Sequence, residues 1–592
     1  MCGIIGITGS KSIVSDLVSV LENLEYRGYD SAGIATVDVS TLHVCKAVGN
    51  LDQLKSSLDS HTPAITGKIG IGHTRWATHG APKLENAHPI ATHKVAVVHN
   101  GIIENYQKLK DELTTLGIQF QSDTDTEVIA HLITVNIENG LDIFEACRMA
   151  ALKLEGSFAV AVISKEFPDT LIGFKHKMPL LVGIGNKEDT LYIASDAIAI
   201  SQFANSVVYL DDQQIAEIKL NGNLKINDLS GSNVKYTLHH IERYNTSNKG
   251  DFPTFMKKEI YEQSDILKDI LSSYQGSNIY WRNVNKICIL ACGSSNYAGY
   301  TAKYFIEGNC DIAVEVDIAS EFATRKPKIY DDTLYLFISQ SGETADTVTA
   351  LNYVKQFNAK TACITSVASS TLGRSSNHVI EMKAGPEIAV AATKTFTAQL
   401  LILLLLSFEI KNKSSQAKLA ELQLFNTALI NEIEINIEKI AHLISNYDKF
   451  LYIGRGTMYP ICLEGALKMR ELSYAPAIGI AAGELKHGSI ALVDSKTLII
   501  ALVPHDETYV KMASAVQEVN ARSGDILLIS DQYSFENLAK FCKYNILLQD
   551  IDNFLKPILY SLPLQLIAYH VAIARGCNVD RPRNLAKSVT VE

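Results

Sequence analysis

The chain has 592 residues, of which 47% are hydrophobic and 20% are charged, and its formal net charge is −10 at pH 7. At about 100–200 residues per domain, this length predicts several compact domains, and the composition excludes a disordered or fibrous chain. Because no run of Lys and Arg offers a surface to a nucleic acid or an anionic membrane, we expect neither partner and expect small-molecule chemistry instead.

The ten cysteines are scattered along the chain, without a CxxC pair or a Cys/His cluster at zinc spacing. This pattern predicts reduced thiols, no metal site and a cytoplasmic protein. The N-terminus lacks the basic and apolar regions of a secretory signal. The most apolar run, LLILLLLSF at 400–408, is shorter than the roughly 20 residues of a spanning helix, so it predicts a buried core helix.

Up to residue 232, short runs typical of β-strands alternate with helical patterns. The strand-like runs include VAVVHN (95–100) and FAVAVIS (158–164), and helices are expected at 101–116 and 127–139. This alternation predicts a layered α/β domain. The segment SNKGDFPTF (247–255), with Gly and Pro among polar residues, predicts a linker.

Two later segments resemble each other, at 287–307 and 450–471. Each runs from an apolar strand through a Gly-containing turn into a helix, and each is followed by a second apolar strand, within 333–344 and 497–507. The repetition predicts a duplicated βα unit and two doubly wound, mainly parallel sheets. Ligands of such sheets bind at the carboxyl ends of the strands.

A cysteine directly behind the initiator methionine is the first candidate for catalysis. If Met1 is removed, Cys2 carries the free α-amino group, whose reference pKa of about 7.7–8.0 lies near that of a thiol at about 8.5. The amine can then act as the base that activates its own side chain. Taken alone, the MCG segment favours the simpler explanation, a thiol that lies near the chain end by chance.

Four further fragments favour the catalytic interpretation. They are YRGYDSAG (26–33), GHTRWATHG (72–80), VVHNGIIEN (97–105) and SDTDTEVIAH (122–131). Together with Cys2 they resemble the glutamine amidotransferase domain of the N-terminal-nucleophile class. The resemblance implies that Cys2 attacks the side-chain amide of glutamine, forms a γ-glutamyl thioester and releases ammonia.

The chemistry of single residues agrees with this resemblance. Arg75 offers a two-pronged donor for an α-carboxylate, and Asp125 offers an acceptor for an α-ammonium group. Asn100 and Gly101 can supply a side-chain amide and a backbone N–H to an oxyanion. An isolated Arg or Asp is more often a surface charge. The resemblance adds Trp76, Thr78 and His79 as glutamine-binding residues.

The segment FISQSGETADT (337–347) lies between an expected strand and an expected helix. Hydroxyls and backbone N–H groups at a helix start can bind a phosphate, and the absence of a following lysine favours a monophosphate over ATP. An ordinary Ser/Thr turn is an equally good explanation from this fragment alone. The candidate phosphate ligands here are Ser339, Gln340, Ser341 and Thr344.

The segment LEGALKMRELSY (463–474) spaces Glu464, Lys468 and Glu471 at i, i+4 and i+7, which places them on one helix face. Surface ion pairing is the simpler explanation, but these charges follow a strand-to-helix turn of the duplicated unit. Downstream lie His487 and, in the closing segment, Lys587. A polar tail is usually disordered, so Lys587 needs a reason beyond its residue type.

The motifs ACGSS, SQSGET, EGALK, GELKHG and NLAKSVTVE supply that reason. They are similar to the paired sugar isomerase (SIS) domains of the glutamine:fructose-6-phosphate aminotransferases (isomerising), and the resemblance runs nearly end to end. It implies an α/β multidomain fold: an N-terminal-nucleophile αββα glutaminase sandwich, then two doubly wound parallel-sheet SIS domains. The implied parts are the amidotransferase domain 1–232, linker and leading helix 233–277, first SIS domain 278–415, connecting helix 416–447, second SIS domain 448–580 and catalytic tail 581–592.

The resemblance also implies a reaction and its residues. Fructose 6-phosphate and glutamine become glucosamine 6-phosphate and glutamate, the first step of hexosamine and UDP-N-acetylglucosamine biosynthesis, without a cofactor. Lys587 would form a Schiff base with the open ketose, Glu471 would move the proton, and Lys468 would polarise a sugar oxygen. His487 would assist ring opening, donated by the second subunit of a homodimer. The implied sugar-phosphate ligands are Ser294, Ser295, Ser339, Gln340, Ser341, Thr344 and Val390.

The resemblance also implies a channel that carries ammonia between domains, with Trp76 as its gate, although a core aromatic is the commoner role of tryptophan. The chain departs from the expected family pattern at Asn296, Ala392 and Ser489, all expected in loops near the sugar site. These departures leave the affinity for the sugar open.

Three alternatives are kept. A different amidotransferase would feed another acceptor, but the acidic loop needed for phosphoribosyl diphosphate is missing from the second half. A non-catalytic sugar-phosphate-binding regulator would have no use for Lys587, Glu471 and His487. An enzyme that runs the sugar chemistry backwards would leave Cys2 idle.

Overall fold

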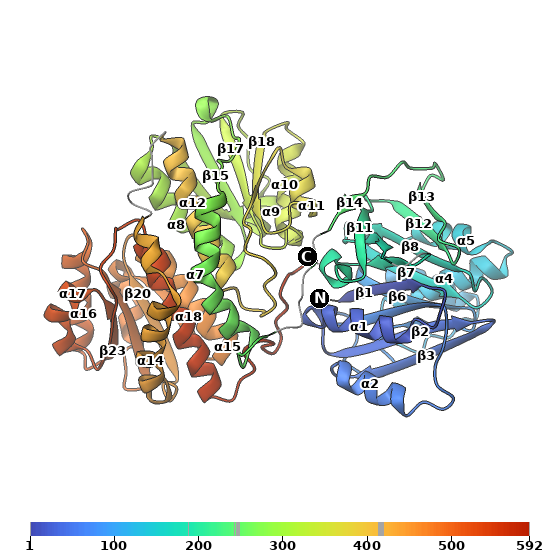
Figure 1. Ribbon diagram of the computed structural model, residues 1–592, viewed down its shortest axis with the longest axis horizontal. Coiled ribbons are helices and arrows are strands. Elements are labelled where there is room, and N and C mark those ends of the chain that lie inside the picture. The colour runs from blue at the N-terminus through green and yellow to red at the C-terminus, as the bar shows by residue number, and fades with distance from the viewer. Residues whose placement is uncertain (1, 187–188, 242, 244–248, 412–419, 591–592) are drawn as a thin grey trace. The chain divides into compact units, whose positions relative to one another are not determined.

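The computed structural model describes residues 2–186, 189–241, 243, 249–411 and 420–590. The chain forms two compact units, one of Met1–Asn248 with Ser588–Glu592 and one of Lys249–Lys587. Figure 1 shows the elements of each unit in chain order. The predicted linker residues 247–248 lie outside the described residues, as do 416–419 of the predicted connecting helix, Met1, and 591–592 of the predicted tail.

The first unit contains two antiparallel sheets. The eight-stranded sheet has the order β14 (His239–His240), β11 (Ala204–Tyr209), β9 (Leu181–Gly185), β10 (Leu191–Ala194), β1 (Gly3–Thr8), β4 (Ile69–Arg75), β2 (Ser31–Asp38) and β3 (Thr41–Val48). The six-stranded sheet has the order β13 (Leu224–Asp228), β12 (Gln214–Lys219), β8 (Thr170–His176), β7 (Gly156–Ser164), β6 (Val95–Ile103) and β5 (Ile90–Ala91).

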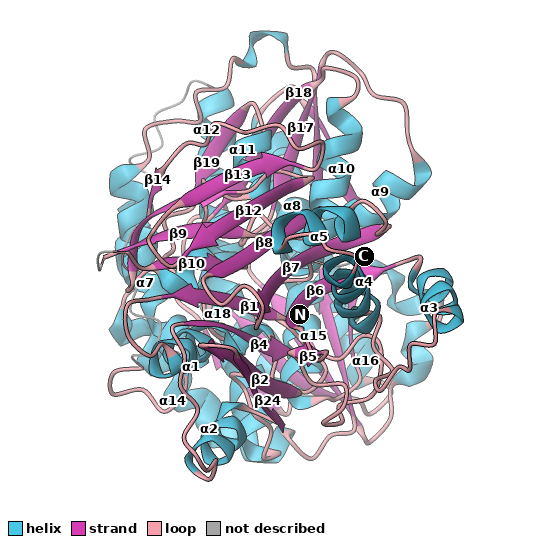
Figure 2. Ribbon diagram, turned by 90° about the vertical axis from the view of Figure 1, so that its right-hand side faces the viewer, coloured by secondary structure: helices cyan, strands magenta, loops and turns pink. Residues whose placement is uncertain are grey.

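Apolar residues of the two sheets pack on each other, and helices cover both outer faces. Ile4, Ile71, Val98 and Ala161 belong to one buried cluster that contains residues of both sheets. The first sheet packs on α1 (Val14–Leu24), and the second packs on α4 (Thr126–Glu138). The remaining helices are α2 (Leu51–Asp59), α3 (Tyr106–Thr115), α5 (Ile143–Ala151) and α6 (Ala197–Ile200). The predicted αββα sandwich is confirmed (Figure 2).

The second unit contains two parallel five-stranded sheets. The strand order of the first sheet is β16 (Ala313–Ile318), β15 (Lys286–Ala291), β17 (Thr333–Ile338), β18 (Lys360–Thr365) and β19 (His378–Glu381). The strand order of the second sheet is β21 (Ala477–Ala481), β20 (Lys449–Gly454), β22 (Thr497–Val503), β23 (Asp525–Ser530) and β24 (Tyr544–Leu547). In both sheets the second strand in the chain lies outside the first and the later strands follow on the other side. The predicted duplication and doubly wound sheets are therefore confirmed.

The helices of the second unit cover the two sheets and fill the space between them. Those used below are α7 (Phe255–Ser273), α8 (Gly293–Asn309), α10 (Ala345–Lys355), α12 (Lys394–Ile410) and α15 (Met458–Ser473). The others are α9 (Ala319–Arg325), α11 (Thr371–Ser375), α14 (Thr427–Ile444), α16 (Tyr509–Asn520), α17 (Gln532–Leu538) and α18 (Lys556–Ala574). One apolar cluster joins residues of both sheets with α12 and α18.

Three local predictions have different outcomes. The apolar run 400–408 lies inside α12 and is buried, as predicted. The helix predicted at 101–116 is wrong at its start, because 101–103 continue strand β6, with Ile102 opposite Ser157 of β7. The chain leaves the sheet at Asn105, whose side chain bonds the 153–155 segment, and α3 begins at Tyr106. The other predicted helix, 127–139, matches α4 within one residue.

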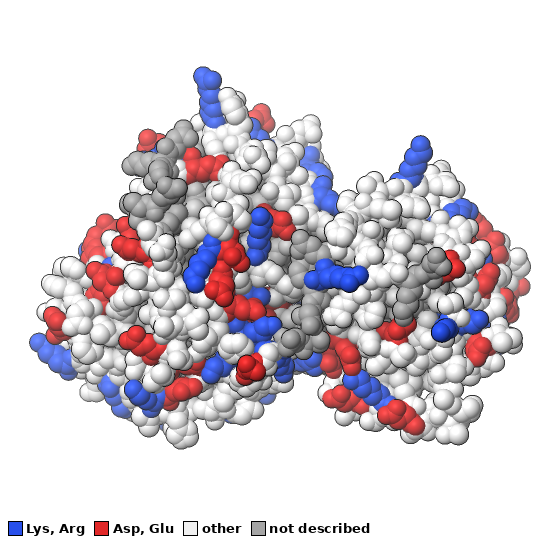
Figure 3. Space-filling model, viewed as in Figure 1, with Lys and Arg blue, Asp and Glu red and all other residues white. Residues whose placement is uncertain are grey.

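Among the described residues, α18 alone is long and apolar enough to cross a membrane by length and composition, and 83% of its most apolar window is buried inside the protein. On the face drawn in Figure 3, basic and acidic side chains are interspersed over each unit.

Candidate active sites

The start of strand β1 brings Cys2 to the end of strand β4. Because Gly3 pairs with Thr74 in antiparallel register, Cys2 lies beside the Arg75–Trp76 segment. The Cys2 Sγ lies 3.3 Å from the Trp76 carbonyl oxygen, and the Trp76 N–H donates to Sγ over 3.2 Å. Burial raises the pKa of the Cys2 thiol. A thiol in this environment needs a base to become a nucleophile.

The second sheet supplies the candidate oxyanion donors. Asn100 lies in β6, and its Nδ2 donates to the Cys2 carbonyl oxygen over 2.9 Å. Gly101 has φ of +124°, and a Cβ there would lie 1.9 Å from the Ser157 carbonyl oxygen, so a side chain at this position is excluded. The predicted pair of oxyanion donors therefore lies beside the predicted nucleophile.

Arg75 and Asp125 are buried and already partly bonded. The Arg75 guanidinium donates to the carbonyl oxygens of His79, Gly80 and Ala81, which orders the loop after β4. Three of its five N–H groups are used, so two remain for a carboxylate. Asp125 precedes α4, and its Oδ2 accepts from the Ile103 N–H over 2.8 Å. Its second oxygen has no hydrogen-bond partner among the described residues and can accept from an α-ammonium group.

The other predicted glutamine-binding residues lie on the same loop. The Trp76 ring packs edge-on against Tyr29 with centroids 5.7 Å apart, and the His79 ring packs against Tyr106 at 5.6 Å. Thr78 is exposed. Sequence analysis missed Asp30, whose carboxylate accepts from the Ala77 N–H over 2.9 Å and holds the loop.

In the second unit, the predicted phosphate-binding residues form a turn between β17 and α10. The Ser339 and Thr344 hydroxyls lie 2.9 Å apart, and the Gly342 N–H donates to Ser339 Oγ over 3.1 Å. Gly342 has φ of +65°, and a Cβ there would lie 1.9 Å from Ser370 Oγ. The Gln340 carbonyl oxygen accepts from the Ser366 N–H, and Ser341 Oγ accepts from the Glu343 N–H. The turn is a preformed loop at a helix start, where phosphates bind.

Glu464, Lys468 and Glu471 form a second buried group, here called the α15 cluster. Lys468 Nζ lies 3.4 Å from Glu464 and 2.5 Å from Glu471, and Ser294 of α8 donates to Glu464 over 3.0 Å. Burial raises the pKa of Glu464 to about 7. Burial alone would lower the pKa of Lys468, but the two carboxylates raise it. The alternative of a surface ion-pair ladder is wrong, because Glu464 and Lys468 are nearly inaccessible. Next to Ser294, Ser295 accepts from Gln399 of α12 over 3.0 Å.

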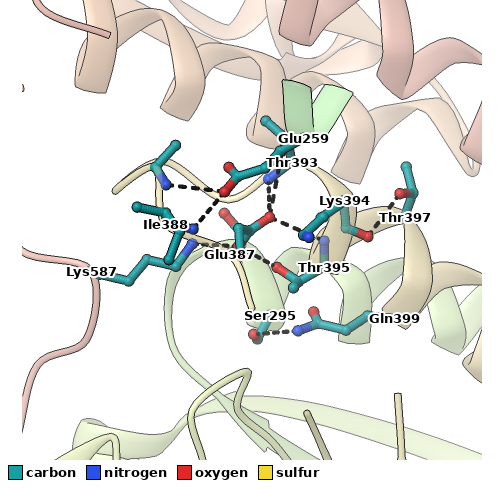
Figure 4. Close-up of polar contacts among 12 residues, drawn as sticks. Glu259, Ser295, Glu387, Ile388, Thr393, Lys394, Thr395, Thr397, Gln399 and Lys587 are labelled. Atoms are coloured by element: carbon teal, nitrogen blue, oxygen red, sulfur yellow. Dashed lines mark hydrogen bonds and ion pairs between the residues drawn. The ribbon is translucent and has the colours of Figure 1, made fainter. Parts of the chain in front are cut away.

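Figure 4 shows the surroundings of Lys587, which ion-pairs with Glu387. The side chain of Lys587 is 5% exposed and that of Glu387 is fully buried. Glu387 also accepts from the Thr393 N–H over 2.9 Å and from the Thr395 hydroxyl over 2.7 Å. These donors and Lys587 lower the pKa of Glu387 against the effect of burial. Nearby, burial and the charge of Glu387 raise the pKa of Glu259 in α7.

Other predicted sugar-site residues lie in different settings. His487 ends a short helical segment, Ala482–His487, is exposed, and makes no polar contact with the part of the chain that the structure describes. Val390 is buried, and its N–H donates to the Asp580 carbonyl oxygen. The expectation that Asn296 lies in a loop is wrong, because it is buried within α8. Ala392 lies in the loop before α12, and Ser489 begins another short helical segment, Ser489–Leu492.

Only one group of described residues has three potential metal ligands close together: Glu434, Glu438 and His570. Glu434 is already paired with Lys257 at 3.0 Å and with His570 at 2.7 Å. These contacts make the group an ion-pair network between α7, α14 and α18.

Sequence analysis missed Glu387 and Glu259, although both lie within the surroundings of Lys587. Glu387 follows Gly385 and Pro386 in a loop, and Glu259 lies in a helix with several other charged residues. Neither the residue type nor the spacing distinguishes these carboxylates from surface charges, so only the folded chain identifies them.

Comparison with known proteins agrees with this geometry. Residues 51–236 match the glutamine amidotransferase domain family, and residues 281–407 and 443–575 match the SIS domain family. An amidotransferase domain followed by two SIS domains defines the class: a glutamine amidotransferase with tandem SIS domains.

Full-length relatives identify the family within that class. The glutamine–fructose-6-phosphate aminotransferases (isomerizing) of Bartonella henselae and Rhizobium meliloti are 43% and 42% identical, with all of both chains covered. The solved C-terminal domain of the Francisella tularensis glucosamine-fructose-6-phosphate aminotransferase is 38% identical, with a TM-score of 0.54, and covers 57% of this chain and 100% of its own. The chain belongs to the glutamine–fructose-6-phosphate aminotransferase (isomerizing) family.

Proposed function

We propose that the protein converts D-fructose 6-phosphate and L-glutamine into D-glucosamine 6-phosphate and L-glutamate. The observation that carries the proposal is the burial of Lys587 against Glu387 in the unit that contains the α15 cluster. A lysine near a chain end would otherwise be exposed, and a buried amine is suited to react with a carbonyl group. The full-length relatives support the same reaction.

In the first unit, once Met1 has been removed, the α-amine of Cys2 takes the thiol proton, and Sγ attacks the amide carbon of glutamine. Asn100 and Gly101 donate to the oxyanion, while Arg75 and Asp125 hold the α-carboxylate and α-ammonium groups. The amine returns the proton to the leaving nitrogen, so that ammonia departs and a thioester remains. Water then releases glutamate and regenerates the thiol.

In the second unit, the Ser339–Thr344 turn binds the phosphate, and Ser294, Ser295 and Val390 line the sugar. Lys587 transfers a proton to a neighbouring carboxylate, attacks C2 of the open ketose and forms an iminium with loss of water. Ammonia replaces Lys587 at C2. Glu471, held by Lys468, takes a proton from C1 and returns it to C2, and the C1 hydroxyl proton passes to the freed Lys587 amine, which leaves an aldehyde at C1 and an amine at C2.

The proposal also covers the oligomeric state, the ammonia channel and the domain limits. We propose a cytoplasmic homodimer in which His487 of one subunit assists ring opening in the other. The expected channel between domains, with Trp76 as gate, and the domain limits derived from the sequence belong to the same proposal. Chemical cross-linking and static light scattering of the purified protein would measure the oligomeric state.

The proposal is tested with glutamine labelled at the amide nitrogen, with and without fructose 6-phosphate. We expect labelled glucosamine 6-phosphate by mass spectrometry, no product from Cys2→Ala, and wild-type yield from Cys45→Ala, which removes a buried thiol elsewhere in the same unit. Glutamate release without labelled amino sugar would overturn the sugar acceptor and move the search to other phosphosugars.

A second experiment tests the Schiff base. Cyanoborohydride should reduce the iminium and fix the ketose on the peptide that contains Lys587. Lys587→Arg keeps a cation beside Glu387 but cannot form the imine, so it should bind fructose 6-phosphate without being labelled. Labelling of any other lysine, or synthesis by Lys587→Arg at the wild-type rate, would contradict this role.

A further inference from the structure

A buried histidine lies directly behind the candidate oxyanion donor. His73, in β4, is fully buried, and its Nε2 lies 3.1 Å from Asn100 Oδ1 and 3.1 Å from the His99 carbonyl oxygen. On the side of Asn100 that faces away from His73, Nδ2 donates to the Cys2 carbonyl oxygen over 2.9 Å. Asn100 is therefore held between His73 and the backbone of the candidate nucleophile.

Two backbone carbonyl groups fix the direction of each hydrogen bond in the series from His73 through Asn100 to Cys2. A carbonyl oxygen only accepts, so the group of Asn100 that faces Cys2 must be its NH₂. The amide oxygen then faces His73. Because the His99 carbonyl oxygen also faces His73 Nε2, that nitrogen must carry the hydrogen and donate. The opposite amide orientation would place two oxygens together at Cys2 and two N–H groups together at His73.

The environment of His73 keeps this arrangement neutral. Burial lowers the pKa of His73 to about 3, so the ring carries one proton at ordinary pH. Its Nδ1 is buried and has no hydrogen-bond partner among the described residues, in agreement with the proton on Nε2. The ring of His88 stacks on His73 with centroids 4.4 Å apart, and His88 in turn bonds Thr126 over 2.8 Å. The His73 ring is thus fixed on several sides.

We propose that His73 is a positioning residue that sets the amide orientation of Asn100 and so aims its second N–H at the oxyanion. This role rests on the proposed glutamine hydrolysis at Cys2. An Nδ2 group has two hydrogens, and the bond to the Cys2 carbonyl uses one of them. Without the donor on His73, only the bond to the Cys2 carbonyl oxygen holds the amide. The amide then rotates more easily and can present its oxygen to the developing negative charge, which that oxygen would repel.

The test compares His73→Leu, which removes the donor, with His73→Gln, whose side-chain amide can donate from a place close to Nε2. Loss of one oxyanion donor slows acyl transfer by about 10²–10³-fold, so we expect His73→Leu to lower kcat for glutamine hydrolysis by about 10–100-fold. KM for glutamine should change less than about threefold, since Arg75 and Asp125 are intact. His73→Gln should recover most of the lost kcat.

Two measurements separate positioning from misfolding. Alkylation of Cys2 by iodoacetamide, followed by mass spectrometry of the N-terminal peptide, needs the thiol but no oxyanion donor, so its rate in His73→Leu should match the wild type. In the Asn100→Ala background, His73→Leu should cause no further loss of kcat, because it acts through Asn100. Cys147→Ser, in α5 of the same unit, changes an equally buried residue without a contact to His73 or Asn100, so it should lower the melting temperature while kcat stays within about threefold.

The outcomes of these experiments distinguish a failure of the His73 role from a failure of the proposed function. A wild-type kcat in His73→Leu, an additive loss in the double variant, a parallel loss of Cys2 alkylation, or no recovery in His73→Gln would overturn the inference and leave the proposed function standing. A wild-type protein that releases no glutamate from glutamine would overturn the proposed function itself and this role with it.

Discussion

The substitution Lys468→Met removes a buried cation and leaves the rest of the α15 cluster in place. The side chain of Lys468 is 1% exposed, and its Nζ lies 3.4 Å from Glu464, which is 2% exposed, and 2.5 Å from Glu471. Methionine is similar in length, so the charge is lost without a large cavity. Removing one partner of a buried ion pair costs about 3–5 kcal/mol, because the other charge is left uncompensated. We expect a loss of this size in the stability of the second unit at about pH 8.

The loss should shrink at lower pH, because Glu464 can then bind a proton. Burial raises the pKa of Glu464 from 4.5 to about 7, against the opposing effect of Lys468. A carboxyl group with a raised folded-state pKa binds its proton more strongly when folded, so stability falls as pH rises from the unfolded value through the folded one. Without Lys468 the pKa rises further, and the pH dependence steepens. The cost of the substitution should therefore be smaller at pH 6 than at pH 8 by roughly 1 kcal/mol.

Urea unfolding followed by tryptophan fluorescence measures this directly. The chain has two tryptophans, and Trp76→Phe leaves Trp281 to report on the second unit. The matched control is Lys449→Met, whose 2.8 Å ion pair with Asp494 is exposed and screened by solvent, so its loss should change the stability little. If Lys468→Met costs no more than the control, or costs the same at both pH values, the energetic role assigned to the buried cluster is wrong.

The other predictions concern single contacts. Gly101→Ala should slow glutamine hydrolysis more than about 100-fold and lower the melting temperature of the first unit, because the alanine Cβ would clash with the Ser157 carbonyl oxygen. Steady-state kinetics and calorimetry would detect the two effects, and a wild-type kcat would contradict the prediction. Gly342→Ala should raise KM for fructose 6-phosphate at least about tenfold, since its Cβ meets Ser370 in the phosphate turn; an unchanged KM would place the phosphate elsewhere. Glu387→Gln should cut amino-sugar synthesis more than about tenfold and leave glutamate release by the first unit intact; parallel loss of both activities would point to a general folding defect.

Local sequence patterns predicted much of the fold. The repeated strand–turn–helix segments predicted two similar parallel sheets, because strand and helix periods are properties of short stretches. The i, i+4, i+7 spacing placed Glu464, Lys468 and Glu471 on one helix face for the same reason. The same patterns failed at residues 101–103, where pairing with β7 outweighed the helical signal.

The sequence by itself determined which chemical groups the chain carries, in which order, and the family to which it belongs, since motifs are contiguous. Only the tertiary structure decided which distant groups meet. Ser294 bonds Glu464 across 170 positions and Lys587 pairs with Glu387 across 200. His73 reaches Asn100 because strands of two different sheets face each other. Contacts of this kind follow from sheet order and packing, for which the spacing of residues along the chain holds no local signal.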